Sequence, residues 1–289
     1  MAAHPFHREL KRIDRELRSG KPLSPELLSR VPLEVLGEVY VGLAGYPSLA
    51  AALPSMAPAQ VQRDWTGADG QPLMSQSCAF LNSVVRAVHE QLPRPLNGAT
   101  VLDYGCGWGR LLRLMLRYTA AERIWGLDPW DRSIELCREH RIPVNLAVCD
   151  YVPKTLPVGD TRFDLIFAFS VFTHLSPRCA LQVMRTLRTY VKDDGMLAIT
   201  VRPPDYWRLH TPFPPGITSE AMLAAHRDAG FAFIPHNRPP IDGDITYGDA
   251  SYSLDYVRST WTGWTIAGTE IHAGGDSHQT LIFLRPSSG

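Results

Sequence analysis

The amino-acid sequence predicts an α/β fold with a doubly wound, mostly parallel seven-stranded sheet, whose last strand is antiparallel, and an N-terminal helical cap. From about Thr100 onward, short apolar runs alternate with helix-like segments, which is the pattern of a parallel sheet covered on both faces. The first hundred residues carry helical stretches separated by Pro- and Gly-rich turns. We therefore expect a cap at 1–95 and a sheet domain at 96–289, with an insertion at about 203–262.

Five apolar runs in the sheet domain have the usual length of a buried strand. They are Thr100–Tyr104, Ile124–Asp128, Asn145–Cys149, Phe163–Phe169 and Met196–Val201. Helices are expected at Arg8–Arg18, Pro25–Val41, Leu73–Leu92, Arg110–Arg117, Asp131–His140 and Pro177–Val191. Ser176 can cap the helix expected at Pro177–Val191 through its side chain. Pro177 suits the first position of that helix.

The C-terminal part predicts a different connection. A helix capped by Thr218 or Ser219 and ended by Gly230 precedes the apolar run Phe231–Ile234. Trp264–Ile271 and Thr280–Leu284 then follow, joined by the short polar segment His272–Gln279. Such a link suits an antiparallel hairpin, since a parallel crossover needs a dozen or more residues. The sheet should therefore contain one reversed strand.

Composition argues against several classes of partner. The sequence has 29 Lys and Arg against 29 Asp and Glu, so no net field favours nucleic acid or anionic lipid. The uncharged segment Val39–Gln62 is interrupted by Pro and Gly, which argues against a membrane span. Five scattered cysteines without CxxC spacing favour a reducing cytoplasm. No His-rich metal spacing occurs, and we read Asp193-Asp194-Gly195 as a turn, so no metal is expected.

The segment Thr100-Val-Leu-Asp-Tyr-Gly-Cys-Gly-Trp-Gly-Arg110 predicts a buried strand, a glycine-rich turn and a helix. Bare backbone at the carboxyl end of a strand suits a nucleotide-containing cofactor. A dinucleotide fingerprint counted from Gly105 would need its third glycine, or an alanine, at Arg110. Asp103 would repel a pyrophosphate but can accept hydrogen bonds from an ammonium group. A nicotinamide-dependent reductase is therefore the less favoured alternative.

This segment resembles motif I of the class I, Rossmann-like S-adenosylmethionine-dependent methyltransferases, in which E/DxGxGxG is the pattern. Asp103, Gly105, Gly107 and Gly109 fill its places, and Tyr104 and Cys106 lie between them. The element order resembles the family over about Leu73–Arg285. Tyr247-Gly-Asp249, Trp261 and Gln279–Arg285 resemble a bacterial branch of type 11, 12 and 25 methyltransferases with little-defined acceptors. The resemblance implies S-adenosylmethionine as cofactor.

The resemblance also implies further cofactor contacts after the strands. They are Asp128 for the ribose diol, with Pro129 after it, Asp150 for the adenine amine, Tyr151 or Trp130 for the faces of the adenine ring, and Ser170 at the cleft. By resemblance only, Trp65-Thr-Gly67 is expected to contact the cofactor as part of a lid; a plain turn is the alternative.

Methyl transfer to a hydroxyl needs a proton acceptor, and His174, in the loop after the fourth strand, is our candidate base. The alternative is that His174 only shapes this loop. Tyr206, Trp207 and Tyr247, together with His174, are expected to line the acceptor pocket, with ordinary packing as the alternative.

We therefore predict a methyltransferase that acts by in-line displacement on an oxygen, or less favourably a nitrogen, of a small metabolite, sugar-like or natural-product acceptor. A peptide or protein acceptor is one alternative, because the Pro-rich stretch Pro203–Trp264 could form an open groove. A catalytically silent cofactor-binding or scaffold protein is another. The sequence is also compatible with a homodimer.

Overall fold

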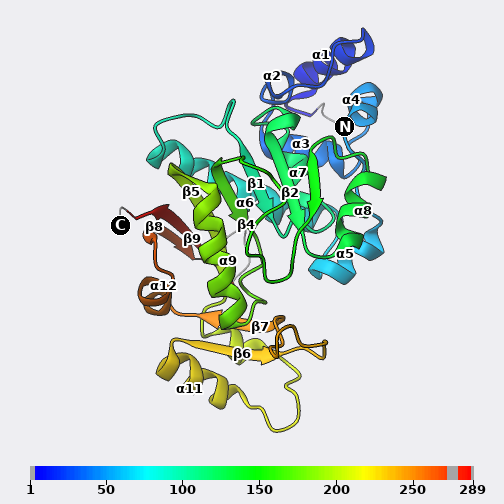
Figure 1. Cartoon of the computed structure of the whole chain (residues 1–289). Helices are drawn as coiled ribbons and strands as arrows, with labels where there is room; N and C mark the ends of the chain where they lie inside the picture. The colour runs from blue at the N-terminus through cyan, green and yellow to red at the C-terminus, as the bar shows by residue number, and fades with distance from the viewer. Residues whose placement is uncertain (1–3, 272–278, 288–289) are drawn as a thin grey trace. The chain divides into compact units, whose positions relative to one another are not determined.

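The computed structural model describes residues 4–271 and 279–287. These residues form two compact units, Met1–Val148 and Cys149–Gly289. Seven strands form one sheet in the order β3-β2-β1-β4-β5-β9-β8, and β6 and β7 form a second, two-stranded sheet (Figure 1). The predicted fold class is confirmed, because the large sheet is mostly parallel and β9 runs antiparallel to both of its neighbours. The predicted domain division stays a prediction.

The first unit begins with helices and continues with three parallel strands. Its helices are α1 (His7–Arg18), α2 (Pro25–Leu28), α3 (Leu33–Tyr40), α4 (Pro47–Ala52), α5 (Ala59–Thr66), α6 (Gly70–Gln91), α7 (Arg110–Met115), the short 3-10 helix η1 (Ala121–Arg123) and α8 (Asp131–Glu139). Its strands are β1 (Val101–Tyr104), β2 (Ile124–Asp128) and β3 (Asn145–Val148). Both ends of each of these three strands lie within one residue of the predicted ends.

The second unit contains the remaining strands and helices. They are β4 (Phe163–Ala168), α9 (Pro177–Tyr190), β5 (Val191–Val201), α10 (Tyr206–Leu209), α11 (Ser219–Ala229), β6 (Phe231–Pro235), β7 (Gly248–Tyr252), α12 (Leu254–Thr260), β8 (Trp264–Ile271) and β9 (Thr280–Pro286). The predicted caps are confirmed: the Ser176 hydroxyl accepts from the Cys179 N–H, and Thr218 caps α11 in the same way. Gly230 ends α11 in the left-handed conformation.

Two sequence predictions about element bounds were wrong. The helix expected over Pro25–Val41 is broken into α2 and α3, because Pro32 cannot donate a backbone hydrogen bond inside a helix. The turn expected at Asp193–Gly195 belongs to β5, which begins directly after α9. Val191 pairs with Phe163, and the Lys192 ammonium lies 2.8 Å from the buried carboxylate of Asp164, so this stretch is held as a strand.

The β6–β7 pair was not foreseen as a separate sheet. Its strands are antiparallel, with Phe231 opposite Tyr252 and Pro235 opposite Gly248. Helix α11 packs beside β6 (Figure 1). β7 is buried throughout, although its sequence, Gly-Asp-Ala-Ser-Tyr, has little apolar character. The small side chains of β7 therefore bring a polar strand into the interior of the second unit.

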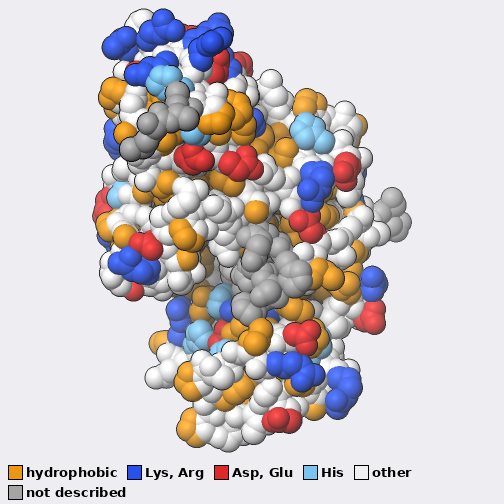
Figure 2. Space-filling view, turned by 180° about the vertical axis from the view of Figure 1, so that it is seen from behind, with side chains coloured by type: hydrophobic (Ala, Val, Ile, Leu, Met, Phe, Trp, Pro, Cys, Tyr) orange, Lys and Arg blue, Asp and Glu red, His pale blue; other side chains and the backbone are white. Residues whose placement is uncertain are grey.

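Charged side chains of both signs are interspersed on the face shown in Figure 2. Lys and Arg gather most closely over α1, whose twelve residues include five basic ones. Among the helices that the structure describes, none is long and apolar enough to cross a membrane. The described residues also contain no group of three or more His, Cys, Asp or Glu side chains arranged to hold a metal ion.

Candidate active site

Three glycines shape the loop that follows β1 in the first unit. Gly105, Gly107 and Gly109 have φ angles of 74°, 53° and 78°, in the left-handed region that favours glycine. A Cβ atom on Gly107 would enter open space, since its nearest neighbour is Trp65 Cε3 at 3.9 Å. A Cβ atom on Gly109 would collide with Ile142 Cδ1. The loop therefore offers bare backbone at Gly107, whereas Gly109 is required by packing.

Asp103 occupies β1 just before this loop, and its carboxyl group is buried. Its Oδ2 atom makes no hydrogen bond with any residue that the structure describes. Burial raises the pKa of the Asp103 carboxyl group well above its ordinary value; the charge of Arg110 opposes this rise and that of Asp128 adds to it. A buried oxygen without a partner is unfavourable unless a ligand supplies a donor. A cationic donor suits this position, because it also favours the ionised form.

Asp128, at the end of β2, is tied to the glycine loop. Its Oδ2 accepts from the Gly107 N–H and its Oδ1 from the Trp130 N–H, each at 2.9 Å. Burial raises the pKa of this carboxyl group, and the hydrogen bonds from Trp130, Gly107 and Ser133 oppose the rise. Each carboxylate oxygen can accept a further bond. Asp128 therefore has capacity for a diol, and its ribose role stays a prediction.

An aromatic pair lies at the side of the loop. The rings of Trp65 and Trp130 are stacked, with centroids 4.6 Å apart and an interplanar angle of 23°. Trp130 is half exposed, whereas Trp65 also packs against the buried cluster that contains Trp108 and Leu73. The segment Trp65-Thr-Gly67, which we expected near the cofactor, thus reaches Gly107 and Trp130 from the end of α5.

The other predicted cofactor residues occupy mixed positions. Tyr104 and Cys106 are buried, so their contribution to a ligand would come from the backbone. Pro129 is partly exposed. Asp150 and Tyr151, which follow β3, are both exposed, and the Tyr151 carbonyl accepts from Cys179 Sγ. Their adenine role stays a prediction.

In the second unit, Ser170 follows β4 with a φ of 60°, which is unusual for a residue with a side chain. Its N–H donates to Thr200 Oγ1 at 2.8 Å, and its hydroxyl accepts from Gln279 Nε2 at 2.6 Å. Strained conformations of this kind collect at functional sites and persist because surrounding bonds hold them. The predicted position of Ser170 at the carboxyl end of β4 thus coincides with a strained backbone.

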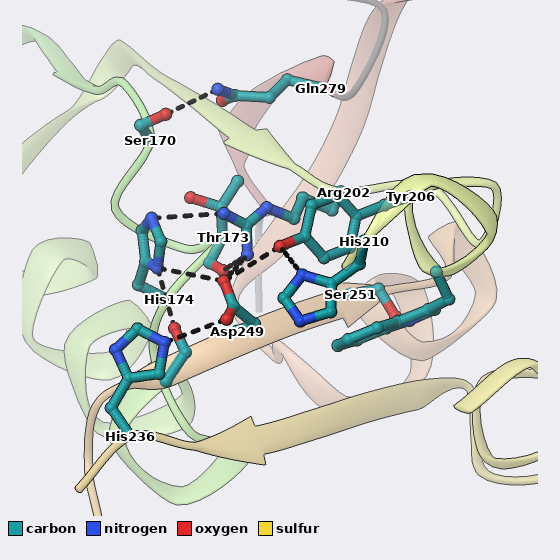
Figure 3. Close-up of polar contacts among 12 residues, drawn as sticks. Ser170, Thr173, His174, Arg202, Tyr206, His210, His236, Asp249, Ser251 and Gln279 are labelled. Atoms are coloured by element: carbon teal, nitrogen blue, oxygen red, sulfur yellow. Dashed lines mark hydrogen bonds and ion pairs between the residues drawn. The ribbon is translucent and has the colours of Figure 1, made fainter. Parts of the chain in front are cut away.

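A polar cluster centred on Asp249 lies at the carboxyl end of β4 and β5 (Figure 3). We call it the Asp249 cluster, and its members are His174, Arg202, Tyr206, His210, His236, Tyr247 and Asp249. Arg202 Nη1 donates to Asp249 Oδ1 at 2.6 Å and the Tyr206 hydroxyl donates to the same atom at 3.0 Å. Burial would raise the pKa of the Asp249 carboxyl group, but the bond from His236 and the charge of Arg202 lower it to about 2. Asp249 is therefore ionised at neutral pH.

His174, our candidate base, is held inside this cluster. Its Nδ1 lies 2.8 Å from the Gly248 carbonyl oxygen, which can only accept, so Nδ1 carries the hydrogen. Its Nε2 lies 3.4 Å from Arg202 Nη2, and its ring stacks on Tyr247 at 4.9 Å. Burial, aided by the charge of Arg202, lowers the pKa of His174 to about 4. These contacts support the loop-shaping alternative, and the base role stays a prediction.

The predicted acceptor-pocket aromatics differ in their surroundings. Tyr206 is partly exposed and lies under the Arg202 guanidinium, 4.0 Å from its ring centroid. Tyr247 stacks on His174 and lies under the Arg238 guanidinium. Trp207 is fully buried, and its Nε1 donates to Ser251 Oγ at 2.7 Å. The geometry therefore supports ordinary packing for Trp207.

Sequence reasoning did not assign functions to Arg202, His210, His236 and Asp249. Asp249 was noted only within the Tyr247-Gly-Asp249 segment. Its role as a hub depends on β7 lying against the loop after β4, where the Gly248 N–H donates to the His174 carbonyl and the Ala250 N–H to the Thr173 carbonyl. Seventy-odd residues separate these partners, and no local spacing signals the pairing.

The fold is similar to that of class I, S-adenosylmethionine-dependent methyltransferases, and the matched family model covers the glycine loop. Residues 101–195 match the protein family described as "Methyltransferase domain". The match begins at β1 and ends within β5, so it covers β1 to β4 and the first part of β5.

Curated relatives are similar over part of the chain. Ubiquinone biosynthesis O-methyltransferase of Methylobacterium sp. is 34% identical over 107 residues, which are 36% of this chain and 41% of the relative. The mitochondrial enzyme of the same name from Bos taurus is 32% identical over 131 residues, 41% of this chain and 33% of the relative. The chain thus spans about two fifths or less of the length of these relatives.

Solved structures share the fold at low identity. A methyltransferase from Clostridium acetobutylicum superposes with a TM-score of 0.51 at 11% identity, covering 80% of this chain and 98% of that one. A second structure is magnesium protoporphyrin IX methyltransferase from Synechocystis, solved with bound S-adenosylhomocysteine. It superposes with a TM-score of 0.50 at 15% identity, and the superposition covers 79% of this chain and 92% of that one.

Proposed function

We propose that this chain binds S-adenosylmethionine at the glycine loop and methylates an oxygen of a small polar metabolite. The observation that carries the proposal is the buried Asp103 carboxyl group, whose Oδ2 has no partner among the described residues, next to the open backbone of Gly107. The ammonium group of the cofactor's methionine part would supply the missing donor, and its positive charge would favour ionised Asp103.

The residues of the first unit fit the rest of this ligand. Asp128 has lone pairs free for ribose hydroxyls, and the exposed face of Trp130 suits a planar base. The cofactor, when bound, supplies a methyl group activated on a sulfonium. The protein's own contribution is to hold and orient both reactants and to exclude water.

An oxygen acceptor is supported by two observations. The curated relatives named above are O-methyltransferases by name. The second unit presents hydroxyl, imidazole and carboxylate groups in the Asp249 cluster, which suit a substrate with hydroxyl groups. The same proposal includes a small-molecule rather than a macromolecular partner. It also includes a reducing, cytoplasmic setting, which is supported by the five cysteines, since none of them forms a disulfide.

Titration calorimetry with S-adenosylhomocysteine tests the cofactor part. We expect the wild type to bind and Gly107→Val to lose at least tenfold in affinity, because the new side chain fills the space beside the loop. Gly98→Val is the matched control, since Gly98 also has a positive φ and open space around its Cβ position but lies before β1. Absence of binding by the wild type, or equal affinity in both variants, would contradict the proposal.

The transfer itself is tested with the methyl-labelled cofactor and a panel of catechols, phenols, sugars and amines. Label is expected in oxygen-bearing acceptors. Binding of the cofactor without label in any acceptor would instead indicate a catalytically silent binding protein.

A further inference from the structure

We propose that His236, held by Asp249, is the group that takes the proton from the acceptor hydroxyl. The inference rests on the proposed function and deepens it, because it names the proton acceptor and restricts the acceptor to a group that carries an O–H. It starts from the two histidines that contact opposite sides of the same buried carboxylate, His174 and His236.

The hydrogen-bond geometry sets the tautomer of His236. Its Nε2 lies 2.9 Å from Oδ2 of the ionised Asp249, so Nε2 must carry the hydrogen. Its Nδ1 makes no hydrogen bond with any residue in 4–271 or 279–287. Figure 3 shows this second nitrogen turned away from Asp249, at the edge of the cluster. The neutral ring therefore presents a lone pair outward.

His236 differs from His174 in two properties that a proton acceptor needs, the hydrogen bonding of its ring nitrogens and its exposure to water. His174 uses Nδ1 as a donor to Gly248 and directs Nε2 at a guanidinium, whereas His236 keeps one nitrogen available. The His236 side chain is 40% exposed against 22% for His174, so it can exchange a proton with water after each turnover. A carboxylate behind an imidazole stabilises the imidazolium that forms and fixes the ring orientation.

The backbone holds this pair in place. The His236 N–H donates to the Tyr247 carbonyl at 3.1 Å, directly beyond the β6–β7 pairing. The His236 ring lies edge-on to Tyr247, with centroids 5.5 Å apart. A ring positioned by its own backbone and by a neighbouring aromatic loses little freedom when it receives a proton.

The charged and titratable groups around His236 come from several elements. Asp249 lies on β7, His174 in the loop after β4 with its ring centroid 6.3 Å away, and Arg202 at the end of β5. Arg238 and Tyr247 belong to the segment between β6 and β7. Arg202 and Asp249 form an ion pair at 2.6 Å, so the negative charge that faces Nε2 is partly neutralised.

The proposed step is a proton transfer coupled to displacement. The acceptor O–H gives its proton to Nδ1 of His236, and the oxygen keeps the electron pair of that bond. The oxygen uses an electron pair to form the bond to the methyl carbon, while the pair of the carbon–sulfur bond leaves with the sulfur of the sulfonium cofactor. His236 ends as an imidazolium paired with Asp249 and releases its proton to water. Asp249 acts as a positioning residue.

Nitrogen-15 NMR of the histidine rings tests the geometry without any turnover. With the wild-type protein at neutral pH, we expect His236 as the Nε2–H tautomer, and in Asp249→Asn a mixture of the two tautomers. The resonance is assigned with His236→Gln. A wild-type His236 in the Nδ1–H form would overturn the proposal.

Kinetics with the best acceptor from the labelled-methyl panel tests the chemistry. His236→Gln should lower kcat about a hundredfold or more, with unchanged affinity for S-adenosylhomocysteine, and remove the loss of rate at acid pH that protonation of the base causes. His89→Gln, an exposed histidine on α6, is the matched control. A His236→Gln protein with the wild-type rate and pH profile overturns this inference alone. A wild type that methylates nothing in the panel overturns it together with the proposed function.

Discussion

At the scale of single residues, two buried carboxyl groups differ in whether the protein supplies hydrogen-bond donors to their oxygens. Asp249 is surrounded by donors, which lower the pKa of its carboxyl group to about 2 despite burial. Asp103 keeps one oxygen without a partner among the described residues, and burial raises the pKa of its carboxyl group. The first is completed by the protein itself, whereas we propose that a bound ligand completes the second. Unsatisfied buried groups of this kind lower stability and mark sites where binding restores it.

Asp103→Asn should therefore separate stability from binding. A raised carboxyl pKa means that the folded state disfavours ionisation, so Asp103 lowers stability as the pH rises through its folded pKa. We expect the ligand-free variant to have an equal or higher Tm than the wild type at pH 8 and at least tenfold weaker binding of S-adenosylhomocysteine. Thermal scans and calorimetry measure both quantities. A lower Tm with unchanged affinity would assign Asp103 a purely structural role.

At the scale of elements, the β6–β7 pair decides where the Asp249 cluster forms. Gly248 of β7 lies opposite Pro235 of β6, and a Cβ atom on Gly248 would collide with the Ile234 carbonyl oxygen. The Gly248 carbonyl also accepts from His174 Nδ1. One glycine thus permits the strand pairing and fixes the tautomer of a neighbouring histidine. Backbone cannot move aside as a flexible side chain can, so this position tolerates no side chain.

Gly248→Ala is expected to destabilise the protein by about 3 kcal/mol, since overpacking against backbone lies at the upper end of such effects. Gly216→Ala is the control, because Gly216 has a φ of 83° and open space at its Cβ position. Gly216→Ala should lower the free energy of unfolding by about 1 kcal/mol, because it introduces backbone strain alone. Urea unfolding monitored by tryptophan fluorescence compares the two, and equal destabilisation would show that the close approach to Ile234 is relieved easily.

At the scale of the whole molecule, histidines that are partly or fully buried make stability depend on pH. Burial lowers the pKa of His174 to about 4 from an ordinary value of 6.5, and those of His140, His210 and His226 are lowered as well. A depressed histidine pKa means that the unfolded chain binds the proton first. The stability contributed by a neutral ring is therefore complete above about pH 6.5 and is lost as the pH falls toward 4. The raised carboxyl pKa values of Asp103 and Asp128 act with the opposite sign.

Comparison of the wild type with His174→Gln isolates the contribution of His174. Between pH 7 and pH 4.5, the wild type should lose more free energy of unfolding than the variant, by at most about 3 kcal/mol, since one pKa unit corresponds to about 1.4 kcal/mol. Urea midpoints at the two pH values provide the measurement. Parallel losses in both proteins would show that His174 takes up its proton without penalty in the folded state.

Local sequence was sufficient for the elements whose signals are local. The strands of the parallel sheet are continuous apolar runs, so β1 and β2 were predicted to within one residue. The glycine loop was recognised from the spacing of Gly105, Gly107 and Gly109 in the sequence. The structure shows that all three adopt positive φ angles. The caps at Ser176 and Thr218 were predictable for the same reason, since a cap depends on neighbours three residues away.

The sequence by itself thus determined the fold class, the glycine loop and its acidic residue, because each depends on periodicity or spacing along the chain. Tertiary structure alone decided which histidine has a nitrogen without a hydrogen bond among the described residues, that Trp207 is buried, and that Asp249 contacts several polar side chains. The physical reason is that hydrogen-bond partners and burial depend on groups brought from distant parts of the chain. The sequence alone does not distinguish His174 from His236. The structure places His174 inside the hydrogen-bond network and leaves His236 more exposed at its edge.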